Sequence, residues 1–161
     1  KSYWQQIPGM WVQGDWASRD TDGCWFLHGR SDDTIKVAGK RVGPAELEEL
    51  LLATRAVSEA AVVGVPDAVK GSAVVCVVVP APGQSPGPDL TERLSAAIVK
   101  GMGAPFRPRQ VFFVKDLPKN RTMKVMRRVI RGVLSGEALG DLSSLANPDA
   151  IDELQAIVAA I

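Results

Sequence analysis

The sequence predicts an α+β fold, in which helices pack on a small and mainly antiparallel sheet. Two β-branched runs, residues 57–65 and 73–79, are separated by a short loop, a pattern typical of adjacent and largely buried strands. Segments with helix-start signals stand before and after this pair. Before a final short helix, the predicted order of elements is ββα, ββ, α, β, α, which is the order of an α+β domain.

The first predicted elements are two strands, residues 25–30 and 34–42, joined by a polar turn at residues 31–33. Gly39 interrupts the second strand, which indicates a bulge or a close approach of a ligand to the backbone. Residues 43–54 are predicted to form a helix, because proline stands at its first position and glutamates gather near its positive end.

Three helices and one strand are predicted after the central strand pair. The first of these helices begins with the capping-box spacing of Asp89 and Glu92. The helices are expected at residues 89–100, 123–135 and 149–160, the strand at 111–114, and a loose tail at 140–147.

The segment 115–131 carries seven cations and one anion, so its local field favours anionic ligands. In the helix predicted over residues 123–135, Lys124 and three arginines recur on one face, while apolar side chains recur on the opposite face. We expect the apolar face to pack on the core and the cations to be exposed, with Lys124 mobile at the start of the helix. A merely solvated basic face is the structural alternative.

The chain as a whole has the length and apolar content of one globular domain, with 161 residues of which 46% are hydrophobic. A net charge of +1 argues against a dedicated nucleic-acid binder. Cys24 and Cys76 lack metal-ligand spacing, which favours buried free thiols in a reducing cytoplasm. No apolar run is long enough to span a membrane, and the opening residues read as the middle of a larger protein. We therefore expect a cytoplasmic fragment with neither nucleic acid nor a membrane as partner.

Three blocks of the sequence, taken together, resemble the last three signature blocks of the adenylate-forming superfamily, the AMP-forming acyl-CoA synthetases. The blocks are Gly14-Asp15, residues 29–51 (GRSDDTIKVAGKRVGPAELEELL) and residues 117–128 (LPKNRTMKVMRR), in the right order and at appropriate separations. The resemblance runs from about Trp4 to Leu154. Residues 59–71 (EAAVVGVPDAVKG) and the tail, residues 140–154 (GDLSSLANPDAIDEL), most resemble acetyl-CoA synthetases and close short-chain relatives.

The resemblance implies a division into domains. Residues 1–31 would be the end of a large N-terminal adenylation domain, and residues 32–161 a mobile C-terminal domain that rotates about a hinge at Asp32. The N-terminal adenylation domain of the same chain is the implied partner, since it holds the acyl pocket and the phosphate loop. The implied activity is that of an acid–thiol ligase: a short-chain carboxylate reacts with ATP and Mg²⁺ to give acyl-AMP, and coenzyme A then takes the acyl group. The isolated fragment is expected to be inactive.

The resemblance also implies which residues form the site. Lys124 would be the catalytic cation of the first half-reaction, reaching the acid and the phosphate. Asp15 and Arg30 would hold the ribose hydroxyls of ATP or AMP, and Arg41 would lie against phosphate. Gly39 would leave room beside the backbone for the pantetheine arm of coenzyme A. No metal ligand is implied.

Met123 departs from the family, which usually has a small residue, most often glycine, just before the lysine. Methionine stiffens the loop there. The resemblance further implies that Lys124 is a target of a lysine acetyltransferase and a deacetylase, and the missing glycine bears against recognition by an acetyltransferase that reads it.

Two other interpretations stay open, a carrier-protein-loading adenylation domain and a free-standing basic module that binds nucleic acid. Carrier-loading domains usually follow the lysine with a valine–aspartate pair, whereas Val125-Met126-Arg127-Arg128 follows it in this chain, as in CoA ligases. A nucleic-acid module would need aromatic side chains among its cations, and the basic helix has none.

Overall fold

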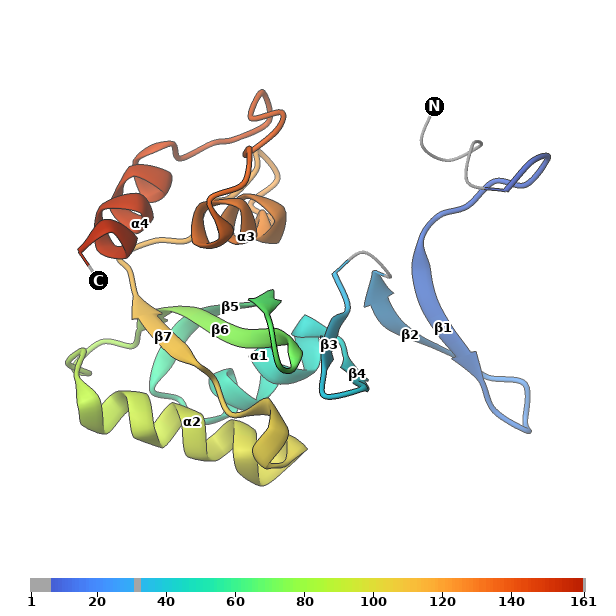
Figure 1. Cartoon of the computed structure of the whole chain (residues 1–161), viewed down its shortest axis with the longest axis horizontal. Coiled ribbons are helices and arrows are strands. Elements are labelled where there is room, and N and C mark those ends of the chain that lie inside the picture. Colours follow the sequence, from blue (N-terminus) through green and yellow to red (C-terminus); the bar gives the residue numbers. More distant parts are fainter. Residues whose placement is uncertain (1–6, 31–32, 161) are drawn as a thin grey trace.

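The computed structural model describes residues 7–30 and 33–160. A two-stranded hairpin stands apart from a sheet that has helices on both of its faces (Figure 1). The strands are β1 (Asp15–Arg19), β2 (Trp25–Arg30), β3 (Ile35–Val37), β4 (Lys40–Val42), β5 (Val57–Asp67), β6 (Gly71–Pro80) and β7 (Gln110–Phe113). The helices are α1 (Pro44–Ala53), α2 (Pro88–Met102), α3 (Arg127–Ser135) and α4 (Asp149–Ala159), with a short 3₁₀ turn at Ala104–Phe106.

The larger sheet is built around β6. It has the order β4-β3-β6-β5, and β7 also pairs with β6. β5 and β6 pair antiparallel from Val57 and Pro80 to Asp67 and Gly71, while β7 runs parallel to β6. The prediction of an α+β fold with a small, mainly antiparallel sheet is therefore confirmed.

Both faces of this sheet are buried, which explains why β5 and β6 read as continuous β-branched runs. Successive side chains of a strand point to opposite faces. Val62 and Cys76 pack toward α1 and α2 in one apolar cluster, whereas Val63 and Val75 pack toward α3 and α4 in the other. Figure 1 shows α1 and α2 on one side of the sheet and α3 and α4 on the other.

The segment 34–42, predicted as one strand interrupted by a glycine, is instead a tight hairpin. β3 and β4 pair antiparallel, and the two residues between them, Ala38 and Gly39, have φ angles of 47° and 82°. Positive φ at both turn positions is the geometry that matches the twist of paired strands, and glycine adopts it without strain. The prediction of a bulge at Gly39 was therefore wrong.

The basic helix is shorter than predicted. α3 begins at Arg127, so Lys124 lies in the turn that precedes the helix and not on its first turn. Met123 has a left-handed φ of 61°, which is incompatible with a helix starting at that residue. The predicted hinge residue Asp32 lies outside the described residues.

Candidate functional site

One cavity is lined by residues that precede positions 31–32 in the sequence and by residues that follow them. Asp15 of β1 and Arg30 of β2 line it together with Lys124, which comes after the last strand, β7, in the sequence. The remaining lining residues are Leu27, Asp33, Pro44, Ala45, Val125, Met126, Arg127 and Arg128. Three residues assigned by the sequence motifs to nucleotide binding and catalysis thus share one cavity.

Gly39 and Arg41 lie elsewhere, on the β3–β4 hairpin. Gly39 is exposed, and a Cβ placed on it would meet nothing within 4 Å. The Arg41 guanidinium lies over the ring of Trp16, 5.4 Å from its centroid. A second cavity beside this pair is lined by Trp16, Arg41, Gly43 and their neighbours. The described conformation therefore does not bring the predicted coenzyme A and phosphate contacts to the Lys124 cavity.

Lys124 is held in a tight loop, residues 119–125, which we call the lysine loop. Lys119 and Val125 pair as an antiparallel bridge at its base. Within the loop the Asn120 N–H donates to the Lys124 carbonyl at 3.0 Å, and the Met123 N–H donates to the Asn120 carbonyl at 2.8 Å. The Lys124 residue itself is exposed. The backbone of the lysine is thus fixed, while its side chain faces solvent.

The side-chain oxygen of Asn120 closes the same loop from inside. Asn120 Oδ1 accepts hydrogen bonds from the Lys124 N–H at 2.8 Å, the Thr122 N–H at 3.1 Å and the Thr122 hydroxyl at 2.9 Å. Nothing in the sequence reasoning singled out Asn120. The spacing Asn-x-Thr-x-Lys was the available signal, because asparagine commonly bonds to backbone a few residues further on.

Comparison with known proteins matches residues 46–124 to the family model described as the AMP-binding enzyme C-terminal domain. This chain contains an AMP-binding enzyme C-terminal domain. The matched span covers most of the sheet, α1 and α2, and it ends on Lys124.

Individual relatives extend the likeness over nearly the whole chain. An acetyl-coenzyme A synthetase of Methanothrix soehngenii is 44% identical over 164 aligned residues, covering 98% of this chain and 24% of the relative. A 3-hydroxypropionyl-coenzyme A synthetase of Sulfurisphaera tokodaii is 43% identical, again covering 98% of this chain and 24% of the relative. The solved acetoacetyl-CoA synthetase from Streptomyces lividans has a TM-score of 0.84 at 25% identity and covers 99% of this chain and 24% of its own. The chain thus spans about a quarter of the length of the curated relatives it matches.

The segment after α3, residues 139–147, crosses back over the lysine loop, and we call it the C-terminal strap. Arg128 of α3 donates to the Leu139 and Asp141 carbonyls, and Arg121 donates to the Ser143 carbonyl. These bonds place the strap across the start of α3 and along the lysine loop.

The strap also pairs with the lysine loop through backbone atoms. The Arg121 N–H donates to the Ser144 carbonyl at 3.0 Å, the Ala146 N–H donates to the Lys119 carbonyl at 2.8 Å, and Asn120 bridges to Leu145. The prediction of a loose tail at 140–147 was therefore wrong. Its composition marks irregular backbone, but composition does not report the partners of that backbone.

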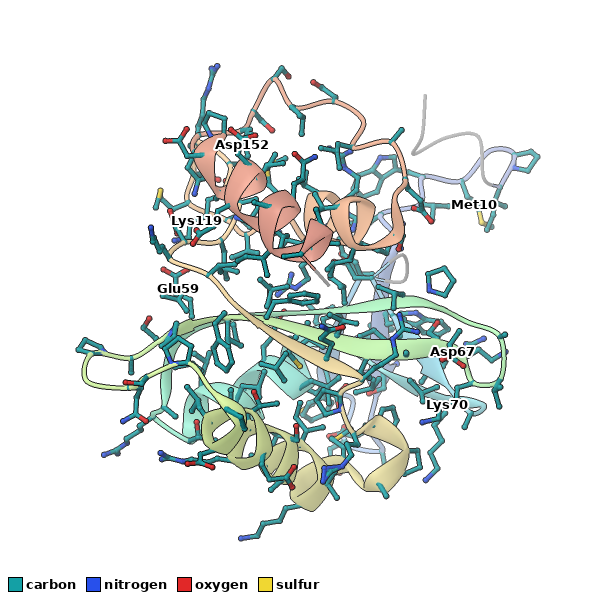
Figure 2. All side chains as sticks on the ribbon, turned by 60° about the vertical axis from the view of Figure 1, so that its left-hand side comes forward. Met10, Glu59, Asp67, Lys70, Lys119 and Asp152 are labelled. Carbon is teal, nitrogen blue, oxygen red and sulfur yellow. The ribbon has the colours of Figure 1, made fainter. Side chains whose placement is uncertain are left out.

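Lys119 is a buried cation of the basic segment, and it precedes the helix whose cations were expected to be exposed. Its ammonium donates to Glu59 Oε1 at 2.8 Å and to Asp116 Oδ1 at 2.7 Å (Figure 2). Partial burial raises the pKa of Asp116, but hydrogen bonds from Lys119, Asn147 and the Leu117 N–H outweigh it and hold that pKa below its usual range. Lys119 therefore anchors the base of the lysine loop to β5.

Arg127 belongs to the helix face whose cations were expected to be exposed, but the structure leaves it only partly exposed. It forms a forked pair with buried Glu48 of α1, with Nε to Oε1 at 2.7 Å and Nη2 to Oε2 at 2.5 Å. Glu48 Oε1 also accepts the Val62 N–H of β5 at 3.0 Å. The hydrogen bonds that Arg127 donates to Glu48 raise the pKa of the Arg127 guanidinium against the opposing effect of burial. This pair fixes the start of α3, and hence the end of the lysine loop, to α1 and β5.

The two cysteines differ in their exposure. Both cysteines are free; Cys76 is buried as predicted, but Cys24 is exposed. Burial raises the pKa of the Cys76 thiol, and Glu48 adds to this effect. Across residues 7–30 and 33–160, three or more His, Cys, Asp or Glu side chains do not gather in a way that could hold a metal ion. In the same residues no helix has the length and apolar character needed to cross a membrane.

Proposed function

We propose that this chain is the C-terminal part of an AMP-forming acyl-CoA synthetase, which activates a short-chain carboxylate with ATP and transfers the acyl group to coenzyme A. The observation that carries the proposal is that Lys124, Asp15 and Arg30 line one cavity, in a chain similar to acetyl-CoA synthetases over almost its whole length. Residues 1–31 would belong to the large N-terminal adenylation domain and residues 32–161 to the mobile C-terminal domain.

Exposed apolar side chains on the first hairpin support an N-terminal domain as partner. Trp25 and Leu27 are 67% and 77% exposed, and Trp11, preceding β1, is 54% exposed. Large apolar side chains gathered on a surface usually mark a contact with another domain or protein. The adenylation domain would cover them, and it would supply the acyl pocket and the phosphate loop.

In the first half-reaction a carboxylate oxygen attacks the α-phosphorus of ATP. The bond between this phosphorus and the oxygen that bridges to the β-phosphate breaks, so pyrophosphate leaves and acyl-AMP remains. Negative charge accumulates on the phosphoryl oxygens during this step, and a cation held nearby stabilises it. The exposed ammonium of Lys124 would be that cation, with its backbone fixed by the lysine loop.

Asp15 and Arg30 would hold the nucleotide in the same cavity. A carboxylate can accept two hydroxyl protons from a ribose, and a guanidinium donates in a fixed fork. Mg²⁺ would accompany the ATP phosphates, which carry the oxygens it prefers as ligands.

In the second half-reaction the sulfur of coenzyme A attacks the acyl carbonyl carbon. The bond from that carbon to the AMP oxygen breaks, AMP leaves, and the thiol proton is released. Rotation about Asp32 would turn the β3–β4 hairpin toward the site, where the exposed backbone at Gly39 leaves room for the pantetheine arm. Arg41 would leave Trp16 to meet a phosphate. A cytoplasmic location and acetylation of Lys124 also stay predictions.

The test is Lys124→Ala in the full-length protein that contains this chain. Acid-dependent pyrophosphate exchange is measured with acetate, propionate and 3-hydroxypropionate, and thioester formation is measured separately from supplied acyl-AMP. We expect the exchange to fall by about 100- to 1000-fold, the usual cost of one preorganised electrostatic contact, while thioester formation is spared. Lys70→Ala is the matched control, because Lys70 is exposed at the far end of β5 and β6 (Figure 2).

Three outcomes would contradict the proposal. A wild-type protein that exchanges pyrophosphate with none of the acids lacks the proposed activity. Equal damage to both half-reactions would make Lys124 a structural residue. A wild-type protein that forms the adenylate but never transfers it to coenzyme A would favour a carrier-protein-loading adenylation domain.

A further inference from the structure

Asn120 lies at the centre of the lysine loop and bonds to it with both its backbone and its side chain. Its Oδ1 accepts three hydrogen bonds, two of them from the backbone N–H groups of Thr122 and Lys124. Backbone N–H groups can only donate, so the carbonyl oxygen of this side chain, and not its NH₂ group, faces the loop.

Asn120 therefore bonds to both the N–H and the carbonyl of Lys124. The Lys124 N–H donates to Asn120 Oδ1 at 2.8 Å, and the Lys124 carbonyl accepts the Asn120 N–H at 3.0 Å. Two bonds at opposite ends of a residue fix the position of its Cα and the direction in which its side chain leaves the backbone. The ammonium remains exposed and lines the cavity that holds Asp15 and Arg30.

The outer side of the lysine loop is held by other parts of the molecule. The C-terminal strap bonds to the backbone of Lys119 and Arg121 and bridges to Asn120 through Leu145. Buried Lys119 is anchored to Glu59 and Asp116. These contacts reach residues 119–121, and the Asn120 side chain extends the anchorage to residues 122–124.

We propose that Asn120 is a positioning residue for Lys124, which transmits the anchorage of the C-terminal strap to the lysine that acts in adenylation. The inference rests on the proposed function. A reacting group displaced by about 1 Å can cost about 100-fold in rate, so the loop that carries Lys124 has to be held without closing its side chain off from the substrate. The Oδ1 acceptor does this through the backbone alone.

The experiment compares three variants of the full-length protein. Asn120→Ala removes the acceptor, Asn120→Asp keeps an oxygen in the place of Oδ1, and Thr122→Val removes only the hydroxyl donor. For Asn120→Ala we expect pyrophosphate exchange to fall by about 10- to 100-fold, with thioester formation from supplied acyl-AMP within about 2-fold of wild type. Asn120→Asp and Thr122→Val are expected to exchange pyrophosphate within about 3-fold of wild type, because both keep the acceptor for the Lys124 N–H.

Hydrogen exchange of the backbone amides at residues 122–124 provides a measurement that does not depend on activity. Asn120→Ala should speed this exchange, whereas Asn120→Asp should not, and the thermal midpoint checks that each variant is folded. Any of three results would overturn the inference. The amides of Asn120→Ala exchange hydrogen at the wild-type rate, Asn120→Ala loses equal activity in both half-reactions, or Asn120→Asp is as impaired as Asn120→Ala.

The same set of proteins separates this inference from the proposed function. If the wild type forms no acyl-adenylate, the proposed function itself fails. If the wild type is active, Lys124→Ala abolishes adenylation and Asn120→Ala does not impair it, only the role of Asn120 is overturned.

Discussion

Met123 shows how the lysine loop accommodates an unusual residue. Its φ of 61° lies in the left-handed region, where a side chain crowds the following carbonyl, and its side chain is 66% exposed. The family resemblance of the sequence implies a small residue, most often glycine, at this position, and the conformation agrees with this, because glycine adopts positive φ without strain. Methionine is tolerated here because its unbranched side chain extends into solvent.

Substitution of Met123 should separate backbone strain from side-chain packing. Met123→Gly relieves a left-handed conformation that costs about 1–2 kcal/mol. It also adds about 0.5–1 kcal/mol of chain entropy to the unfolded state, so we expect a net gain in stability of about 0–1.5 kcal/mol. Met123→Val should lower the stability, because a β-branched residue fits positive φ least well. Thermal midpoints of the full-length protein measure both, and a Met123→Gly variant less stable than Met123→Val would contradict the strain.

The sequence was sufficient to place Lys124, Asp15 and Arg30 in motifs of recognisable spacing, and the structure brings all three to one cavity, while their roles stay predictions. It was not sufficient to tell Lys119 from Lys124. Both are lysines of one basic segment, and what buries Lys119 is Glu59, a residue 60 positions earlier in the chain. Burial of a charge is decided by such distant partners, which local sequence does not specify.

Between elements, the Arg127–Glu48 pair connects α3, α1 and β5 at one point. The Glu48 side chain is buried and serves as acceptor to both the Arg127 guanidinium and the Val62 N–H. Breaking a buried pair by removing one partner leaves an uncompensated charge, whereas removing both charges together does not. The pair therefore stabilises the contact of the three elements chiefly because loss of one partner would leave the other charge buried and unpaired.

We expect Arg127→Met to destabilise the protein by about 3 kcal/mol, since it leaves Glu48 charged and buried. Adding Glu48→Gln to that variant should restore part of the loss, because glutamine keeps an acceptor for the Val62 N–H without the charge. Urea unfolding midpoints measure the series, with Arg131→Met, on an exposed residue of α3, as a control within about 0.5 kcal/mol of wild type. A double variant no more stable than Arg127→Met would contradict the buried-charge explanation.

The elements themselves were predicted well where hydrophobic pattern defines them. α1, β5, β6 and α4 lie close to their predicted ranges, since apolar runs and capping residues mark them locally. Turn geometry was the weaker part. The hairpin at Ala38-Gly39, the late start of α3 and the pairing of the C-terminal strap all depend on positive φ angles or on backbone partners far away in sequence.

At the scale of the whole molecule, Lys124 and the two hairpin residues that share its cavity account for only part of the proposed chemistry. The chain spans about a quarter of the relatives' length. Under the proposed function, the acyl pocket and the phosphate loop would belong to the N-terminal adenylation domain.

We therefore expect residues 1–161 alone to form no acyl-CoA from ATP, Mg²⁺, coenzyme A and acetate or propionate. Thioester formation is measured as the consumption of free thiol, with the full-length protein as positive control and circular dichroism as the check on folding. Acyl-CoA production by the isolated chain would show that the proposed dependence on an adenylation domain is wrong.

The stacking of Arg41 on Trp16 joins a residue before residues 31–32 to a residue after them. If the proposed rotation about Asp32 takes place, this contact would contribute to its conformational equilibrium. A cation–π contact at an exposed site is worth about 0.5–1 kcal/mol. An energy of that size multiplies the ratio of two conformations by about 2- to 5-fold. At rest, the contact would enrich molecules whose Lys124 already lines the cavity with Asp15 and Arg30, while leaving every other arrangement within reach of thermal motion. The Trp16 ring would thereby shift the relative populations of the conformations before a substrate binds, without locking any molecule in one of them.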